Sequence, residues 1–271
     1  TCYSKNYKEY EENGLFVIRN KEVVVPQTIV WGDWWCYDDP YGSIINPIAP
    51  KAQEIIGQKY VELMPKGIDG FWLDLGEPEN VPLQAYYGDY PNEEFCLYFG
   101  REWIKIVHKA VSEAYPDYRP FLLARCGFTG TPGYQTAIWS GDCSSNFINF
   151  RRQIFLALNS GITGFSNWGS DSGGFLSQFK LPDEELYLRW NQFSCFSPMF
   201  RTHGKKTPRE PWAFSEETKK LAIDLIWLRK KLIPYIYSAA YETYRKGIPM
   251  MRALYMEHPE DERSYEIGDE Y

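Results

Sequence analysis

The chain has 271 residues, of which 44% are hydrophobic and 17% are aromatic, and it carries a formal net charge of −7. This apolar content excludes a disordered or fibrous chain, and the acidic balance without Lys and Arg clusters argues against a nucleic-acid partner, since phosphates bind clustered basic groups. The surplus of aromatic rings favours a ligand on which rings stack, and a sugar is the better candidate.

Short apolar runs alternate along the chain with longer segments of helical periodicity, which is the pattern of βαβ units around a parallel sheet. In chain order we predict a strand or edge at 23–30, a helix at 50–64 closed by Gly67, a strand at 71–75, a helix at 93–115, strands at 121–125 and 136–140, a helix at 147–159, a strand at 162–168, and helices at 184–196 and 216–247. About five convincing strands compare with the eight of a closed barrel. The predicted fold class is therefore α/β, a (β/α)8 TIM barrel of which the chain holds roughly the last five or six βα units, and we expect a fragment of a longer polypeptide.

The sequence lacks the patterns of a disulfide framework, a membrane span, a leader or a metal site. Six cysteines without CxxC pairs read as mostly free thiols, at positions 2, 36, 96, 126, 143 and 195. There is no apolar run of about 18 residues and no charged-then-apolar leader, so we expect no membrane partner and leave the compartment open between cytoplasm and periplasm. No HExxH, Cys-His or calcium-loop pattern is present, so we expect no metal and no cofactor.

Three predicted strands each run into an aspartate: Asp74, Asp142 and Asp171. In barrels of this class the chemistry lies at the carboxyl ends of the strands. Glycoside cleavage needs two carboxyl groups, and in retaining enzymes these lie about 5 to 5.5 Å apart and come from different elements that converge. Asp74 and Asp142 fit that requirement, because two successive barrel units can span the residues between them and bring both strand ends to one pocket.

Four stretches carry a resemblance to glycoside hydrolase family 31, the α-glucosidase and α-xylosidase family. They are 70–79 (GFWLDLGEPE), 124–147 (ARCGFTGTPGYQTAIWSGDCSSNF), 167–175 (NWGSDSGGF) and 192–204 (QFSCFSPMFRTHG). Their order and spacing agree with the family, and with the flanking helices the resemblance covers nearly the whole chain. It implies that residues 1–271 belong to the catalytic barrel, and that the family's N-terminal β-sandwich and C-terminal β domains are not in this chain.

The resemblance also implies a role for each matching residue. Asp74 is expected to be the nucleophile of a retaining, exo-acting α-glycosidase, and Asp142 the acid that protonates the departing oxygen and then activates water. Asp142 should be kept protonated by Asp74 nearby and by partial burial, and Arg125 should help keep Asp74 ionised. The residues expected to bind the sugar are Trp72, which faces the pocket by alternation with Asp74, and Arg125, Trp139, Asp171 and His203.

Several of these residues also have structural readings that the sequence leaves open. Asp171 could hold its Ser-Asp-Ser-Gly-Gly turn, His203 could be a hydrogen-bonded structural residue, and Arg201 could be an ion-pair partner. Glu77 and Glu79 are expected to organise a loop. The densest aromatic cluster could be core or a stacking wall and includes a further candidate contact, Asp33; its rings are Trp31, Trp34 and Trp35.

The substrate is expected to be an oligosaccharide or simple α-glycoside. The Gly76-Glu77 pair resembles bacterial α-xylosidase-like branches, whereas those branches place Lys where this chain has Trp72. Glucose, xylose, galactose and sulfoquinovose therefore remain open, as does assembly into a homo-oligomer. Alternative functions are an α-transglycosylase or an α-glucan lyase with the same nucleophile, or a carbohydrate-binding fragment without activity.

Overall fold

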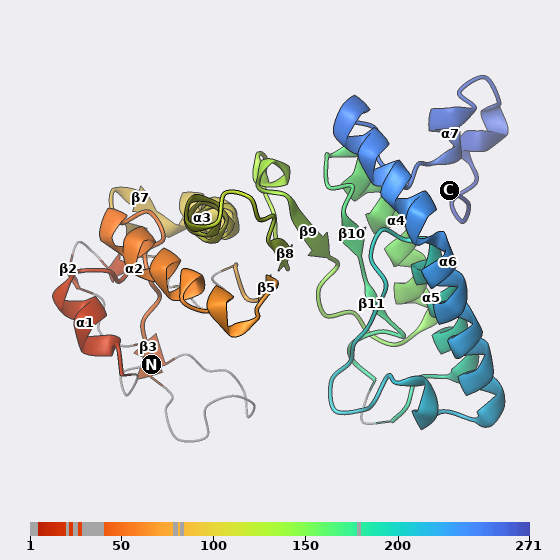
Figure 1. Cartoon of the computed structure of the whole chain (residues 1–271), viewed down its shortest axis with the longest axis horizontal. Coiled ribbons are helices and arrows are strands. Elements are labelled where there is room, and N and C mark those ends of the chain that lie inside the picture. Colours follow the sequence, from red (N-terminus) through yellow and green to blue (C-terminus); the bar gives the residue numbers. More distant parts are fainter. Residues whose placement is uncertain are drawn as a thin grey trace. The chain divides into compact units, whose positions relative to one another are not determined.

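A computed structural model describes residues 5–19, 22–23, 27–28, 41–77, 81, 84–177 and 180–271. The chain divides into two compact units, Thr1–Thr136 and Ala137–Tyr271, and each is described by itself (Figure 1). The tryptophan cluster with Asp33, and Glu79, lie outside the described residues.

The first unit is built on two parallel strands covered by helices. Strand β5 (Gly70–Leu73) pairs in parallel with β8 (Phe121–Ala124), with Trp72 opposite Leu123. Helix α3 (Asn92–Ala114) follows β5 in the chain, and α2 (Pro50–Val61) precedes it. One face of the strands packs on α3 to form a buried apolar core of Phe71, Leu73, Ile104, Val107, Val111, Leu122 and Ala124.

The remaining elements of the first unit are short. They are helix α1 (Tyr7–Glu12), strands β1 (Ile18–Arg19), β2 (Glu22–Val23), β3 (Gln27–Thr28), β4 (Tyr41–Gly42), β6 (Ala85–Tyr87) and β7 (Tyr90–Pro91), and the 3-10 turns η1 (Met64–Lys66) and η2 (Thr131–Tyr134). Strands β2, β1, β6 and β7 form an antiparallel sheet in that order, and β3 pairs with β4.

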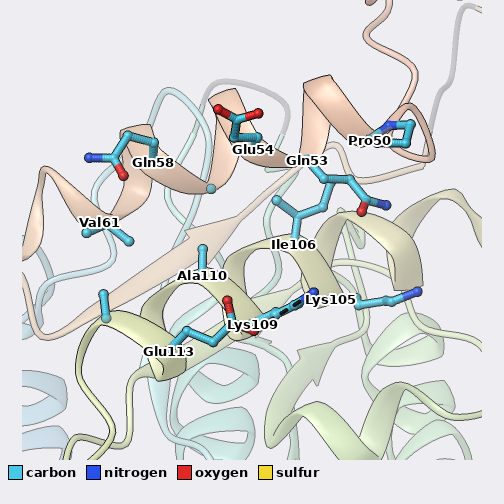
Figure 2. Close-up of a pocket in the computed structure, with 12 residues that line it drawn as sticks. Pro50, Gln53, Glu54, Gln58, Val61, Lys105, Ile106, Lys109, Ala110 and Glu113 are labelled. Carbon is cyan, nitrogen blue, oxygen red and sulfur yellow. Dashed lines mark ion pairs between the residues drawn. The ribbon is translucent and has the colours of Figure 1, made fainter.

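Helices α2 and α3 cross closely because a glycine stands at their contact. A Cβ added at Gly57 of α2 would lie 2.7 Å from the Cβ of Ala110 on α3. Beside this contact a groove of about 680 Å³ runs between the two helices, lined by polar and charged side chains such as Glu54, Gln58 and Lys109 (Figure 2). The groove follows the helices and not the strand ends, so it is separate from the candidate site.

The second unit repeats the alternation of parallel strands and helices. Strand β9 (Thr136–Trp139) pairs in parallel with β10 (Trp168–Gly169), and β11 (Asp171–Ser172) pairs in parallel with β12 (Arg201–Thr202). The other elements are helices α4 (Phe147–Ile162), α5 (Glu184–Phe196), α6 (Glu216–Lys246) and α7 (Leu254–Glu257), with 3-10 turns η3 (Pro211–Ala213) and η4 (Glu262–Tyr265).

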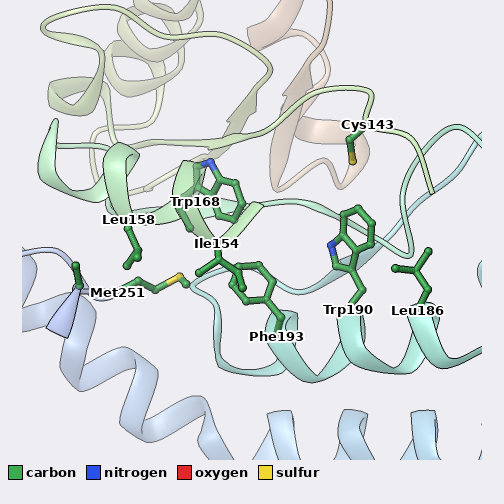
Figure 3. Packing of buried hydrophobic residues seen from close by; sticks show 10 residues of the cluster. Cys143, Ile154, Leu158, Trp168, Leu186, Trp190, Phe193 and Met251 are labelled. Carbon is green, nitrogen blue, oxygen red and sulfur yellow. The ribbon is translucent and has the colours of Figure 1, made fainter. Parts of the chain in front are cut away.

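The core of the second unit lies between these strands and helices α4 and α5 (Figure 3). Trp168 from β10 meets Ile154 and Leu158 from α4 and Trp190 and Phe193 from α5. Helices α4, α5 and α6 each begin at a side chain that accepts a hydrogen bond from a backbone amide of the first turn, and these caps are Asn146, Asp183 and Ser215. The caps fix where each helix starts, and therefore how far each preceding loop extends.

The predicted helices and the strands predicted at 71–75, 121–125 and 136–140 are confirmed to within a few residues. Helix α2 ends at Val61, and Gly67 closes the 3-10 turn η1 in the left-handed conformation. Most of the strand or edge predicted at 23–30 lies outside the described residues. The strand predicted at 162–168 is wrong. Helix α4 continues to Ile162, the chain then turns through Gly164 at φ +95°, and only Trp168 of that range is in a strand. No helix in the described ranges is long and apolar enough to cross a membrane.

Candidate active site

Asp74 directly follows the last residue of β5, on the face that points away from the helices. Phe71 and Leu73 are buried in the core, whereas Trp72 is 49% exposed and Asp74 is exposed. Side chains alternate between the two faces of a strand, so Trp72 and Asp74 share the face opposite α3. The predicted alternation of these two residues is confirmed.

Arg125 stands at the corresponding end of β8, between two carboxylates. Its Nε lies 3.6 Å from Asp74 Oδ1, and its Nη2 forms an ion pair with Glu77. The Arg125 side chain is 12% exposed, while both carboxylates are partly exposed. Arg125 therefore joins the loops that follow two neighbouring parallel strands. The expected proximity of Arg125 to Asp74 is confirmed, and Glu77, which we expected to organise this loop, pairs with Arg125.

The turn after Asp74 packs tightly against Cys126 and helix α3. Leu75 has φ +55°, and Gly76 is buried against the thiol of Cys126. A Cβ at Gly100 of α3 would lie 2.2 Å from Cys126 Sγ, so only glycine lets the helix approach this closely. Burial, followed by the neighbouring Glu77 carboxylate, raises the pKa of Cys126 to about 12. Cys126 is thus a neutral packing group and not a nucleophile.

Asp142 lies in the loop that follows β9. Gly141 before it has φ +73°, and Cys143 after it is buried, which raises the pKa of that thiol to about 11. Asp142 itself is exposed. The predicted partial burial of Asp142 is therefore wrong, because the chain turns its neighbour Cys143 into the core and leaves Asp142 outside it.

Asp171 is fully buried and forms an ion pair with Arg201, its Cα partner on the adjacent strand β12. The Arg201 guanidinium lies 4.9 Å from the ring centroid of Trp139 at the end of β9. The structural role left open for Arg201 is confirmed as an ion pair. Three residues from three strand ends thus form one contiguous group of a carboxylate, a guanidinium and an indole.

His203 follows β12, and its ring stacks on that of Phe175, with centroids 5.3 Å apart and an interplanar angle of 27°. Its loop is held by Arg209, a residue that the sequence did not single out. Arg209 is 3% exposed, and burial lowers the pKa of its guanidinium while the nearby Asp171 opposes that change. The sequence signals for it are the glycines at 173 and 204, where an added Cβ would meet its side chain.

The structure groups the predicted site residues into two sets, one in each unit. Asp74 and Arg125 meet in the first unit, with Trp72 on the same face of β5 as Asp74. The second unit carries the others, Trp139, Asp142, Asp171 and His203. Within the described ranges no group of three or more His, Cys, Asp or Glu side chains is arranged to hold a metal. The described residues at the strand ends supply carboxylates, ion pairs and aromatic faces.

Comparison with known proteins identifies relatives of this chain. The model of the glycosyl hydrolases family 31 TIM-barrel domain matches residues 2–239. An α-xylosidase from Saccharolobus solfataricus is 33% identical over 84% of this chain and 33% of the relative. Alpha-glucosidase 2 of Bacillus thermoamyloliquefaciens is 30% identical over 90% of this chain and 32% of the relative. The chain thus spans about a third of the length of these curated relatives.

Solved structures agree with this result. A dextranase from Flavobacterium johnsoniae in complex with glucose superposes with a TM-score of 0.88 and 27% identity, covering 97% of this chain and 34% of that one. An α-xylosidase from a soil metagenome in complex with xylose gives a TM-score of 0.88 and 26% identity, covering 99% of this chain and 42% of that one. The predicted TIM-barrel fold class is confirmed.

Proposed function

Because the chain belongs to glycoside hydrolase family 31, we propose that it carries the catalytic carboxylates of a retaining, exo-acting α-glycosidase. Asp74 is the nucleophile and Asp142 the general acid and base, and residues 1–271 form part of the catalytic barrel. The observation that carries the proposal is the position of Asp74 at a strand end, beside Arg125 and on the same face as Trp72.

In the first step the Asp74 carboxylate attacks the anomeric carbon while the bond to the leaving oxygen breaks. Asp142 gives its proton to that oxygen, so the aglycone departs as a neutral alcohol and a glycosyl-aspartate ester remains. Arg125, 3.6 Å from Asp74, supplies a positive charge beside the carboxylate and orients it. The exposed positions of both aspartates leave them accessible to a substrate.

In the second step the Asp142 carboxylate accepts a proton from water, and the resulting hydroxide attacks the same carbon. The ester bond breaks, Asp74 leaves as a carboxylate, and two inversions give net retention of the α configuration. The same residue serves as acid and then as base because the first step leaves it deprotonated.

The sugar bound at the attacked position is held by Trp72, Arg125, Trp139, Asp171 and His203. Aromatic faces bury the apolar faces of sugars, and carboxylates and imidazoles accept or donate hydrogen bonds to hydroxyls. Asp171 in its ion pair with Arg201, and His203 stacked on Phe175, are held in fixed orientations. Fixed polar groups favour one arrangement of hydroxyls, which is the basis of sugar selectivity.

The substrate class follows from the relatives. Those with curated names include an α-xylosidase and α-glucosidases, and the solved structures include a dextranase and a sulfoquinovosidase. The two curated names denote enzymes of α-linked xylose and glucose. We therefore assign this chain to an α-glucoside or α-xyloside, with hydrolysis as the reaction.

The test uses the natural protein that carries this chain, with 4-nitrophenyl α-glucoside, α-xyloside and α-galactoside as substrates. Proton NMR should show the α-anomer of the free sugar first. First release of the β-anomer contradicts retention, and no release from any of the three contradicts the glycosidase assignment. Transfer of the sugar to an added sugar acceptor, or an eliminated sugar in place of the free one, would instead identify a transglycosylase or a lyase.

A further inference from the structure

Arg209 is a buried cation whose guanidinium donates mainly to backbone carbonyls, with further bonds to the hydroxyls of Thr207 and Ser145. Its Nε and Nη2 donate to the Gly174 carbonyl at 3.0 and 2.8 Å, and Nη2 also donates to the Phe175 carbonyl at 3.3 Å. Its Nη1 donates to the carbonyl of Thr207 at 2.9 Å and to that of Pro208 at 3.2 Å. One side chain thus joins the loop after β11 to the loop after β12.

A third loop joins the same network through Ser145. The Ser145 hydroxyl donates to the Gly173 carbonyl at 2.7 Å and lies 3.5 Å from Arg209 Nη2. The backbone of the same segment bonds Leu176 in both directions, from Ser145 N to Leu176 O at 2.8 Å and from Leu176 N to Cys143 O at 3.0 Å. The chain that carries Asp142 is therefore fixed on the loop that Arg209 holds.

Glycines leave these loops no room to shift. A Cβ at Gly174, which has φ +79°, would lie 2.6 Å from Ser145 Cα, and one at Gly204 would lie 2.5 Å from Arg209 Cζ. The loops meet in van der Waals contact, backbone against backbone, with the guanidinium between two of them. Displacing Arg209 must move all three.

We propose that Arg209 is a positioning residue that sets the location of Asp142 and His203 by clamping the loops that follow β9, β11 and β12. Asp142 lies three residues before Ser145, and His203 precedes Gly204. The inference rests on the proposed function, since it concerns where the acid and a sugar contact of that reaction stand. Arg209 itself, at 3% exposed, is placed away from substrate and acts through these loops.

Lysine cannot replace the clamp although it keeps the charge. A guanidinium donates along several fixed directions at once, whereas an ammonium is a point charge with a single nitrogen. Arg209→Lys therefore keeps a cation in the pocket and loses most of the carbonyl contacts. A shift of about 1 Å in a catalytic group is enough to lower the rate about 100-fold.

A matched control exists in the same unit. Arg229 also donates to backbone carbonyls, to Cys195 at 3.0 Å and Pro198 at 2.7 Å among them, and burial lowers its pKa as it does for Arg209. Its contacts fix the end of α5 and not the loop of Asp142. Arg229→Lys should likewise remove guanidinium bonds to backbone carbonyls, fewer than at Arg209, without displacing the acid.

The experiment compares kcat/KM of the natural protein and the two variants on a 4-nitrophenyl glycoside and on a 4-methoxyphenyl glycoside, which has a poorer leaving group. Activity is expressed per active site, counted by covalent trapping with a 5-fluoro glycosyl fluoride. Arg209→Lys should lose about tenfold more on the poor leaving group than on the good one, because a displaced acid protonates it less well. Arg229→Lys should lose the same factor on both. An equal loss on both substrates for Arg209→Lys overturns the inference.

Ser145→Ala tests the same clamp if Arg209→Lys does not fold. It removes the hydroxyl that donates to Gly173 and should show the same leaving-group dependence at smaller size, whereas an equal loss on both substrates again overturns the inference. Asp142→Ala separates this result from the proposed function. If Asp142→Ala shows no leaving-group dependence, the proposed function fails; if it does and the clamp variants do not, only the clamp fails.

Discussion

The two units hold their parts of the candidate site by different means. In the first, Asp74 and Arg125 come directly after paired strands, and a line of charges from Asp74 through Arg125 to Glu77 joins the two strand ends. In the second, Asp142 and His203 lie on loops, and a buried guanidinium fixes those loops through backbone carbonyls. A residue next to a strand needs only its neighbours to place it, whereas a residue on a loop needs a contact that fixes the loop itself.

The largest effect is expected from removing the proposed nucleophile, Asp74. Asp74→Ala should lower kcat on the order of 10⁴-fold, the scale found when one member of a catalytic set is lost. Added azide should restore turnover by attacking from the vacated face, and NMR should identify the product as the β-glycosyl azide. Asp89→Ala, an exposed aspartate between β6 and β7, is the control and should keep normal turnover. Near-normal activity of Asp74→Ala would remove Asp74 from its role.

Removing the proposed acid, Asp142, should have a smaller effect that depends on the substrate. Asp142→Ala should lower kcat/KM by about 10² to 10⁴-fold on a poor leaving group and much less on 4-nitrophenyl glycosides, which leave without a proton. Steady-state kinetics on the two substrates measures this difference, with Asp224→Ala on the exposed face of α6 as the control. A loss of the same size on both substrates counts against an acid role.

The charged link of the first unit can be broken by one substitution. Glu77→Gln keeps the shape of the side chain and removes the carboxylate that pairs with Arg125, so kcat/KM should fall about tenfold, as expected for a slightly displaced catalytic group. The same change removes a charge that raises the pKa of Cys126, so that pKa should fall below about 12.

Alkylation by iodoacetamide at pH 10, followed by peptide mass spectrometry, measures the change at Cys126. Its labelling should be faster in Glu77→Gln than in the unchanged protein, because a lower pKa leaves more thiolate. Cys143 is the internal control, since its pKa of about 11 owes nothing to Glu77. Unchanged labelling of Cys126 would show that the Glu77 carboxylate does not raise the pKa of this thiol.

The smallest effect is expected from the packing behind Asp74. Gly100→Ala forces a Cβ against Cys126 Sγ and should lower the free energy of unfolding by about 1–3 kcal/mol. Gly133→Ala, where a Cβ meets nothing within 4 Å, should change it by less than about 0.5 kcal/mol. Urea denaturation compares the two, and equal values would mean that the close approach of α3 contributes nothing.

Sequence patterns predicted the elements well wherever periodicity and a local signal agreed. The helix predicted at 184–196 begins and ends at the same residues in the structure. The long helix predicted at 216–247 is capped by Gly247 in the left-handed conformation. The pattern failed at 162–168, where alternating apolar residues suggest a strand but Gly164 turns the chain after a longer helix. An alternating apolar pattern over a few residues does not show that the preceding helix extends further than predicted.

The sequence points to candidate site residues whose side chains carry distinctive chemistry. It does not point to a residue that acts only through its position in the fold. Asp74, Asp171 and His203 stand in recognisable strings at strand ends. Arg209 donates to carbonyls, which every residue has, so no partner in the sequence points to it. The exposure of Asp142 depends on which way one peptide turns into the core, and hydropathy says nothing about that choice.

The backbone at Leu75 has a consequence for attempts to improve this protein. A leucine at φ +55° holds a conformation that glycine adopts freely, at a cost of about 1 kcal/mol. Replacing Leu75 with glycine removes this backbone strain. The same change increases the conformational freedom of the turn that follows Asp74. Selection for heat tolerance alone would therefore tend to erode turnover at this position, and a library built for thermostability should keep Leu75 fixed.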